Sequence, residues 1–382
     1  MIPVDPSTMS GLPAPLWFIL FFKIVGFFLH LIPMGLWFAG LPIAAYAAAR
    51  QGEQGRLWTR RFLKQLPVIL ALGINFGIVP LLFLQVAYYK AFYTATILMA
   101  WHWLFVVGFV MVAYYGVYWM AFRSDRLVSG SDCERKAIIR QAIAFSLVLA
   151  FVGTIMTMGL TLTASPERWD ALLNETNVAG AVSGWGADWG NPSIWARLLV
   201  TFGLGVVTTS AWIVCDAAWL RGKKSEEEDA AYKSWAQNFA GRTALFLGAP
   251  LVVLGTVFFW AVQHPDLRSQ IMSAWIVLPI LALAALIGSA VWLFLNRDAK
   301  PSGKIALIAA GLQVAALLLH AVNRQLTQHL DIGRWFKVGA IPEDVQWSPI
   351  VAFLLCFVFG LTVIGWMIAQ LQHAKPSEST SE

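Results

Sequence analysis

The feature that most constrains this chain is a succession of apolar runs, each long enough for a helix to cross a lipid bilayer. A crossing needs about 20 apolar residues at a rise of about 1.5 Å per residue. Nine runs meet this rule, at residues 16–49, 66–87, 96–122, 138–163, 193–219, 243–263, 271–295, 305–323 and 348–371. Hydrophobic residues make up 58% of the chain and charged residues only 13%, too little polar surface to cover a soluble globule. The sequence therefore predicts an all-α bundle of about nine transmembrane helices.

The positive charges between the runs predict the orientation of the chain. If the N-terminus is outside, the inner connections hold 19 Lys and Arg residues and the outer connections hold seven. Cytoplasmic connections usually carry the excess of Lys and Arg. We therefore expect the N-terminus outside and the C-terminus inside. The net charge of +6 is no sign of nucleic-acid binding, because the Lys and Arg residues lie between apolar runs.

We expect a single transmembrane domain over residues 1–375, with two polar connections of different kinds. Residues 164–192 are rich in Gly and Trp and predict an outer loop that packs on the membrane surface or on a partner. Residues 221–242 are rich in charge and predict an exposed inner connector, either a helix or a hairpin. The last residues, 376–382, predict a disordered tail.

Three histidines fall within the apolar runs, where a polar side chain is costly and therefore a candidate for function. His30 lies in the first run, His102 in the third and His320 near the end of the eighth. Counted along the runs at helical rise, all three lie in the outer half of the membrane. A neutral imidazole suits axial ligation of haem iron, and an interhelical hydrogen bond is the alternative for each ring taken alone. Zinc is a weaker choice, because no carboxylate or thiolate lies at that depth.

Two cations near these histidines are candidates to hold the propionates of a haem. Lys23, on the first run, either reaches the outer surface or pairs with a propionate. Arg324 follows His320 by one helical turn and is either a propionate partner or an anchor at the membrane boundary. Gly77, in the second run, permits the close approach of a helix or of a flat macrocycle. Apart from Asp216, no Asp or Glu lies well inside a run, although transmembrane proton relays are usually built from carboxylates.

Several stretches of the chain resemble subunit I of the cytochrome bd family of quinol oxidases. They are "FFLHLIPMGLWFAGLPIAAY", "LGINFGIVPLLFLQ", "YYGVYWMAFRSDRL" and "HAVNRQ", in the first, second, third and eighth runs. The resemblance implies that His30 is an axial haem ligand and that His102 falls near a functional Glu of the third span. It also implies that His320 replaces a ligating Glu, and that Arg324 and Gln325 match the Arg-Gln that follows it.

Three departures from the family argue against oxygen reduction. The connection between the sixth and seventh runs is only "HPDLRSQ", where the family has a long quinol-binding loop. The fifth run has no His, and the third has no carboxylate. We therefore expect a haem b subunit of a respiratory complex, which passes electrons between the quinone pool and an outer-side partner such as a c-type cytochrome.

This interpretation places the protein in the inner membrane of a bacterium, beside other membrane or periplasmic redox subunits. It implies one or two haem b groups as cofactors, with quinone as a further candidate ligand. Two alternatives remain open. One is a haem-free scaffold that anchors partner subunits, and the other is a true cytochrome bd-like oxygen reductase.

Overall fold

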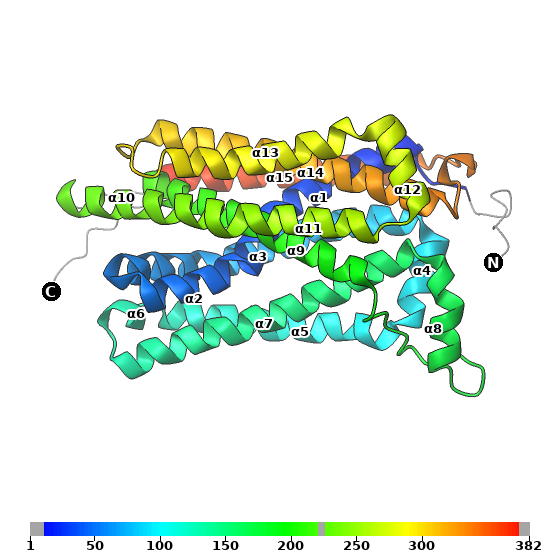
Figure 1. Cartoon of the computed structure of the whole chain (residues 1–382), viewed down its shortest axis with the longest axis horizontal. Coiled ribbons are helices and arrows are strands. Elements are labelled where there is room, and N and C mark those ends of the chain that lie inside the picture. Colours follow the sequence, from blue (N-terminus) through cyan, green and yellow to red (C-terminus); the bar gives the residue numbers. More distant parts are fainter. Residues whose placement is uncertain (1–10, 221–225, 374–382) are drawn as a thin grey trace.

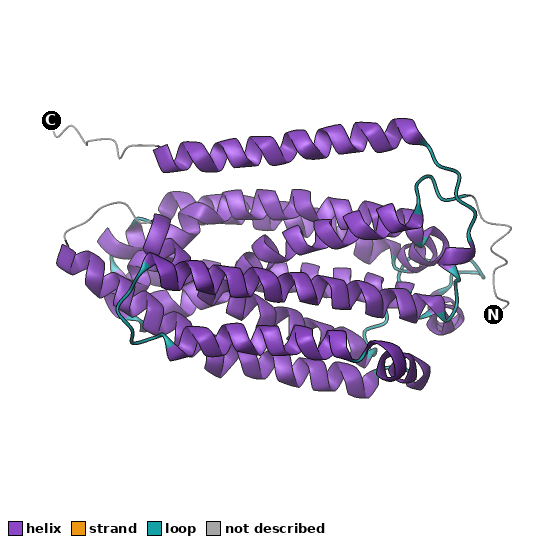
Figure 2. Cartoon of the chain, turned by 90° about the horizontal axis from the view of Figure 1, so that it is seen from above, coloured by secondary structure: helices purple, strands orange, loops and turns teal. Residues whose placement is uncertain are grey.

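The computed structural model describes residues 11–220 and 226–373, which form helices joined by turns and short loops (Figure 1). The long helices lie side by side in one elongated bundle, as two perpendicular views show (Figures 1 and 2). Within the described residues, nine helical segments are long and apolar enough to cross a membrane. The prediction of an all-α bundle of nine spans is therefore confirmed.

The first span consists of α1 (Leu16–Phe38) and α2 (Gly40–Arg50). The next four crossings contain α3 (Gly52–Ala87), α5 (Ala100–Arg123), α7 (Asp132–Thr163) and α9 (Pro192–Cys215). The last four contain α10 (Glu226–Thr243) with α11 (Ala249–Val262), then α13 (Val277–Leu295), α14 (Gly303–Gly333) and α15 (Trp347–His373). Shorter helices in the connections are α4 (Tyr89–Leu98), α6 (Arg126–Ser129), α8 (Trp169–Thr176) and α12 (Pro265–Gln270). We call the end of the bundle at which α1 begins the N-terminal end; α15 ends at the opposite end (Figure 1).

Two crossings extend beyond the apolar runs that predicted them. Helix α3 begins at Gly52, and its polar first turns carry Trp58 and Phe62, both fully buried. The sixth crossing begins at Asp229, inside the segment predicted as an exposed connector. That segment is helical, but residues 232, 236 and 240 are fully buried along one face, so its predicted exposure is wrong. Residues 221–225 and the predicted tail at 376–382 lie outside the described residues.

Small residues let α9 lie at the centre of the bundle, in contact with α1. A Cβ added to Gly35 of α1 would lie 3.2 Å from the Cα of Gly205 of α9. This distance shows that the two backbones meet directly, as small residues allow in membrane helices. Two-thirds of the most apolar stretch of the crossing that contains α9 is buried, and this crossing is the most enclosed of the nine candidate spans in the described chain.

A buried ion pair joins α3 to the last turn of this central crossing at the opposite end of the bundle. Arg61 donates hydrogen bonds of 3.1 and 2.9 Å to the two carboxylate oxygens of Asp216, and Gln65 donates a third of 2.6 Å. The Asp216 side chain is 1% exposed. These contacts join α3 to the central crossing.

Candidate functional site

A cavity of about 820 Å³ lies along one face of α1 in the N-terminal half of the bundle. Eight helices form its walls, namely α1, α3, α5, α7, α9, α11, α13 and α14. Most of the lining is apolar, and the charged and imidazole groups all come from α1, α9 and α14. Ligand sites typically have volumes of about 300–1,000 Å³ with a few convergent polar groups in an apolar wall. This cavity is therefore the candidate functional site.

His30 is held in this cavity by α3. Its Nδ1 lies 2.7 Å from the backbone carbonyl oxygen of Gly73. Because a carbonyl oxygen can only accept, Nδ1 carries the proton and Nε2 keeps its lone pair, with no hydrogen-bond partner among the described groups. Gly77, one turn further along α3, makes room for the ring, because a Cβ there would lie 2.8 Å from both Cε1 and Nδ1 of His30. The close approach predicted at Gly77 is thus that of the His30 imidazole.

Arg324 is the centre of the polar wall. It lines the cavity together with Lys23, His30 and His320. Its guanidinium carbon lies 4.1 Å from the centre of the Phe27 ring, in a cation–π contact. The structure therefore brings together four of the six residues that the sequence suggested for a cofactor site: Lys23, His30, His320 and Arg324.

Lys23 does not reach the surface of the protein. It is 3% exposed, and its Nζ donates a 2.6 Å hydrogen bond to Oε1 of Gln328 and lies 4.7 Å from the centre of the Tyr88 ring. The alternative of a surface-reaching lysine is therefore wrong. Gln328 was missed in the sequence, although residues 320, 324 and 328 recur every four positions and so share one face of a helix.

Arg197, one of the seven Lys and Arg residues counted in the outer connections, also lines the cavity. Its Nη2 lies 3.9 Å from a carboxylate oxygen of Asp331, and its Nε is buried without a hydrogen-bond partner. Asp331 is itself paired with Arg334. In the part of the chain that the structure describes, no carboxylate forms an ion pair with Lys23 or Arg324. Asp331 thus pairs with Arg197 and Arg334, Lys23 and Arg324 have no carboxylate partner among the described residues, and this end of the cavity suits a ligand with negative charge.

His102 lies outside the cavity, although its neighbour Trp103 lines it. The His102 ring centre lies 5.4 Å from that of Trp185 and 6.0 Å from that of Trp189, and its Nδ1 is buried without a partner. The expectation that all three imidazoles meet at one site is therefore wrong for His102. Consecutive residues of a helix point about 100° apart, so equal depth does not place two side chains on the same side.

Gln325 also lies outside the cavity lining. It is buried, and its Nε2 has no hydrogen-bond partner among the described groups, so its predicted place in a cofactor site is corrected. Among the described residues, no group of three or more His, Cys, Asp or Glu is arranged to hold a metal ion. An iron in this cavity would therefore need an organic ligand such as a porphyrin, which requires only one or two protein ligands.

The loop over residues 164–192 packs on the ends of α4 and α5. The Gly186 amide donates to the carbonyl of Leu98, at 2.8 Å. Arg168 donates hydrogen bonds of 3.3 and 2.9 Å to the buried carboxylate of Asp188, and these bonds raise the pKa of Arg168. The contact predicted for this Trp-rich loop with the membrane surface or a partner stays a prediction.

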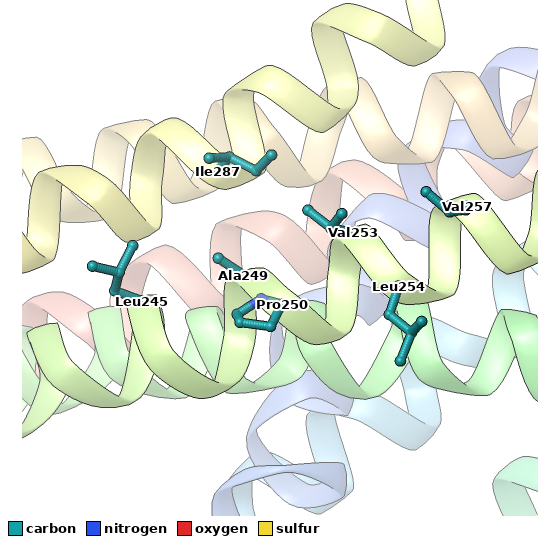
Figure 3. A pocket seen from close by; sticks show the side chains of 7 residues that line it. All are labelled: Leu245, Ala249, Pro250, Val253, Leu254, Val257 and Ile287. Atoms are coloured by element: carbon teal, nitrogen blue, oxygen red, sulfur yellow. The ribbon is translucent and has the colours of Figure 1, made fainter.

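A second hollow, of about 480 Å³, lies between α11 and α13. Its lining consists of apolar side chains between residues 245 and 257, with Ile287 facing them from α13 (Figure 3). It offers no hydrogen-bonding side chain. This hollow suits the acyl chain of a lipid, and it has no polar side chain that could take part in a reaction.

No protein-family model matches the sequence, and no curated protein matches it. The function must therefore be argued from the cavity itself.

Proposed function

We propose that the protein is a haem b-binding membrane subunit of a respiratory electron-transfer complex. One observation carries this proposal. The imidazole of His30 has its Nδ1 held by Gly73, its Nε2 free, and an excess of buried positive charge around Arg324 beside it. These are the groups that an iron macrocycle with carboxylate substituents requires.

The residues of the cavity fit haem b in three respects. A metal-ligating histidine almost always donates its other N–H to a carbonyl or carboxylate, as His30 does to Gly73. Two propionates would place two negative charges among Lys23, Arg197 and Arg324, which lack enough carboxylates of their own. The apolar side chains that α1, α11 and α13 contribute to the lining suit the face and edges of a porphyrin.

Each group has a definite task. A bound haem supplies one-electron redox chemistry. The Gly73 carbonyl fixes the orientation of the His30 ring and increases the electron density at Nε2. Gln328 and the Tyr88 ring hold Lys23 away from the surface, so that its charge acts inside the protein. His320, which also neighbours Arg324, is the candidate for a second axial ligand.

The proposed electron donor is a quinol of the membrane and the proposed acceptor is a c-type cytochrome on the outer side. Each quinol that becomes a quinone releases two protons and two electrons, and the electrons pass singly to the acceptor. The N-terminal half of the bundle, which holds the cavity, is the outer half if the charge-based orientation is correct. That position favours an acceptor outside a bacterial inner membrane.

A pyridine haemochromogen assay on the purified protein tests this proposal. We expect haem b in the wild type, loss of most of it in His30→Ala, and a changed spectrum in His320→Ala. His102→Ala is the matched control, because His102 is an intramembrane histidine outside the cavity. A colourless wild-type protein would overturn the proposal and favour the scaffold alternative. Unchanged haem content and spectrum in His30→Ala would remove His30 as a ligand.

A further inference from the structure

The cavity reaches the lipid-facing surface between α3 and α5. Leu104, Val107 and Met111 of α5 line the cavity and are nevertheless 59, 63 and 53% exposed. Across from them, Ile78 of α3 also lines the cavity and is 45% exposed. These four side chains, 78, 104, 107 and 111, therefore form the rim of a lateral opening, and all of them are apolar.

Behind this opening, one hydroxyl of α7 faces the cavity without a hydrogen-bond partner. Thr154, Thr161 and Thr163 each donate to the carbonyl oxygen four residues earlier in the helix. Thr157 lines the cavity and makes no side-chain hydrogen bond to any described group. The amide of Asn323, on the far wall, is likewise without a side-chain partner among the described residues. The inner part of the cavity therefore offers free donors to a ligand that arrives through the opening.

We infer that a long-chain quinone enters between α3 and α5, ring first, and that Thr157 donates a hydrogen bond to one of its ring oxygens. This inference rests on the proposed function, because it gives the electron donor a place in the same cavity, at the walls that α5 and α7 form. The isoprenoid tail lies over the apolar rim at Val107 and Met111 and continues into the bilayer.

The opening has apolar side chains at its rim and hydrogen-bond donors further inside the cavity. This order favours a quinone over a lipid acyl chain. A phospholipid keeps its headgroup at the membrane surface and would present only a terminal methyl group to Thr157 and Asn323. Leaving these donors unpaired next to an apolar chain is unfavourable. A quinone carries its oxygens on the ring at one end of the molecule, so it can satisfy buried donors while its tail remains in lipid.

Photolabelling with a short-chain azido-ubiquinone in lipid nanodiscs, followed by peptide mapping, tests this site. We expect label on peptides of α5 and α7, with decylubiquinone as the competitor. Thr157→Val removes one hydrogen bond at nearly constant volume and should raise the half-competing concentration about fivefold. Thr154→Val is the matched control, because its hydroxyl is bonded to Ala150. Val107→Trp should close the opening and lower labelling about tenfold, whereas Val112→Trp, exposed but outside the lining, should not.

Label confined to other helices, or equal labelling of Thr157→Val, Val107→Trp and their controls, would overturn the inference. Equal competition by oleate would also overturn it, since the opening would then hold an acyl chain only. Haem content is measured on the same samples. Labelling of α5 and α7 in a protein without haem would refute the proposed function alone, and a haem-loaded protein without this labelling would refute the quinone site alone.

Discussion

The fit between Gly77 and His30 can be measured as a free energy. In Gly77→Ala, the new Cβ would lie 2.8 Å from Cε1 and Nδ1 of His30, whereas ordinary van der Waals contact begins at 3.4 Å. The imidazole must then move, and its 2.7 Å hydrogen bond to Gly73 is lost. Overpacking costs about 1–3 kcal/mol and a lost hydrogen bond about 1 kcal/mol, so the free energy of unfolding should fall by about 2–4 kcal/mol.

A double-mutant cycle separates this clash from other effects of the substitution. The three atoms nearest to the added Cβ all belong to His30. In a His30→Ala background, Gly77→Ala should therefore cost nothing, and it should even stabilise the helix by about 0.5–1 kcal/mol, because Ala has the higher helix propensity. The coupling energy between the two positions should reach at least about 2 kcal/mol.

The assay is reversible unfolding in mixed micelles with increasing SDS, followed by circular dichroism. Gly108→Ala on α5 is the control, because a Cβ at Gly108 meets nothing within 4 Å. The haem content of Gly77→Ala should also fall, since the displaced ring moves its Nε2. Equal stability of Gly77→Ala and Gly108→Ala, or a coupling energy near zero, would refute the proposed packing of His30 against α3.

Two further predictions concern the frame around the cavity and its orientation. Asp216→Asn leaves Arg61 without its charge partner and should lower the free energy of unfolding by about 3 kcal/mol in the same assay. Asp125→Asn, at an exposed pair with Lys64, should cost less than about 1 kcal/mol, and equal losses would contradict this ranking. Cys133 is exposed at the start of α7, which the charge-based orientation places on the inner side of the membrane. With the other two cysteines replaced by serine, Cys133 should therefore react with an impermeant maleimide only after permeabilisation. Labelling of intact cells would place the N-terminus inside.

The fold could be predicted because apolar run length translates directly into membrane crossings. Helix limits could not be obtained in this way, since polar turns also continue a helix when one of their faces is buried. In α3, Trp58 and Phe62 are buried within a segment that carries Arg60, Arg61 and Lys64. A search for apolar runs does not find such a segment. Its apolar residues recur at helical spacing, and this spacing indicates that one face of the segment is buried.

The sequence could predict how deep the site residues lie in the membrane, but it could predict only in part which way their side chains point. Counting residues placed three histidines at one level, and this argument says nothing about where each ring points around its helix. His30 and His320 face the cavity, whereas His102 packs against Trp185 and Trp189. On α14, the four-residue spacing between His320 and Arg324 was available in the sequence, and extending it by one turn would have found Gln328 and excluded Gln325.

The balance of charge favours a ligand with negative charge. Buried cations in a membrane-spanning bundle are costly unless they are paired. Among the described carboxylates, Asp331 pairs with Arg197 and Arg334, and none pairs with Lys23 or Arg324. Hydrogen bonds to Gln328 and contacts with the rings of Tyr88 and Phe27 reduce this cost, but they add no negative charge. A negatively charged molecule in the cavity would reduce this cost further. A ligand with two carboxylates would restore the balance most fully, which is why the cations, as much as the histidines, favour a haem with its two propionates.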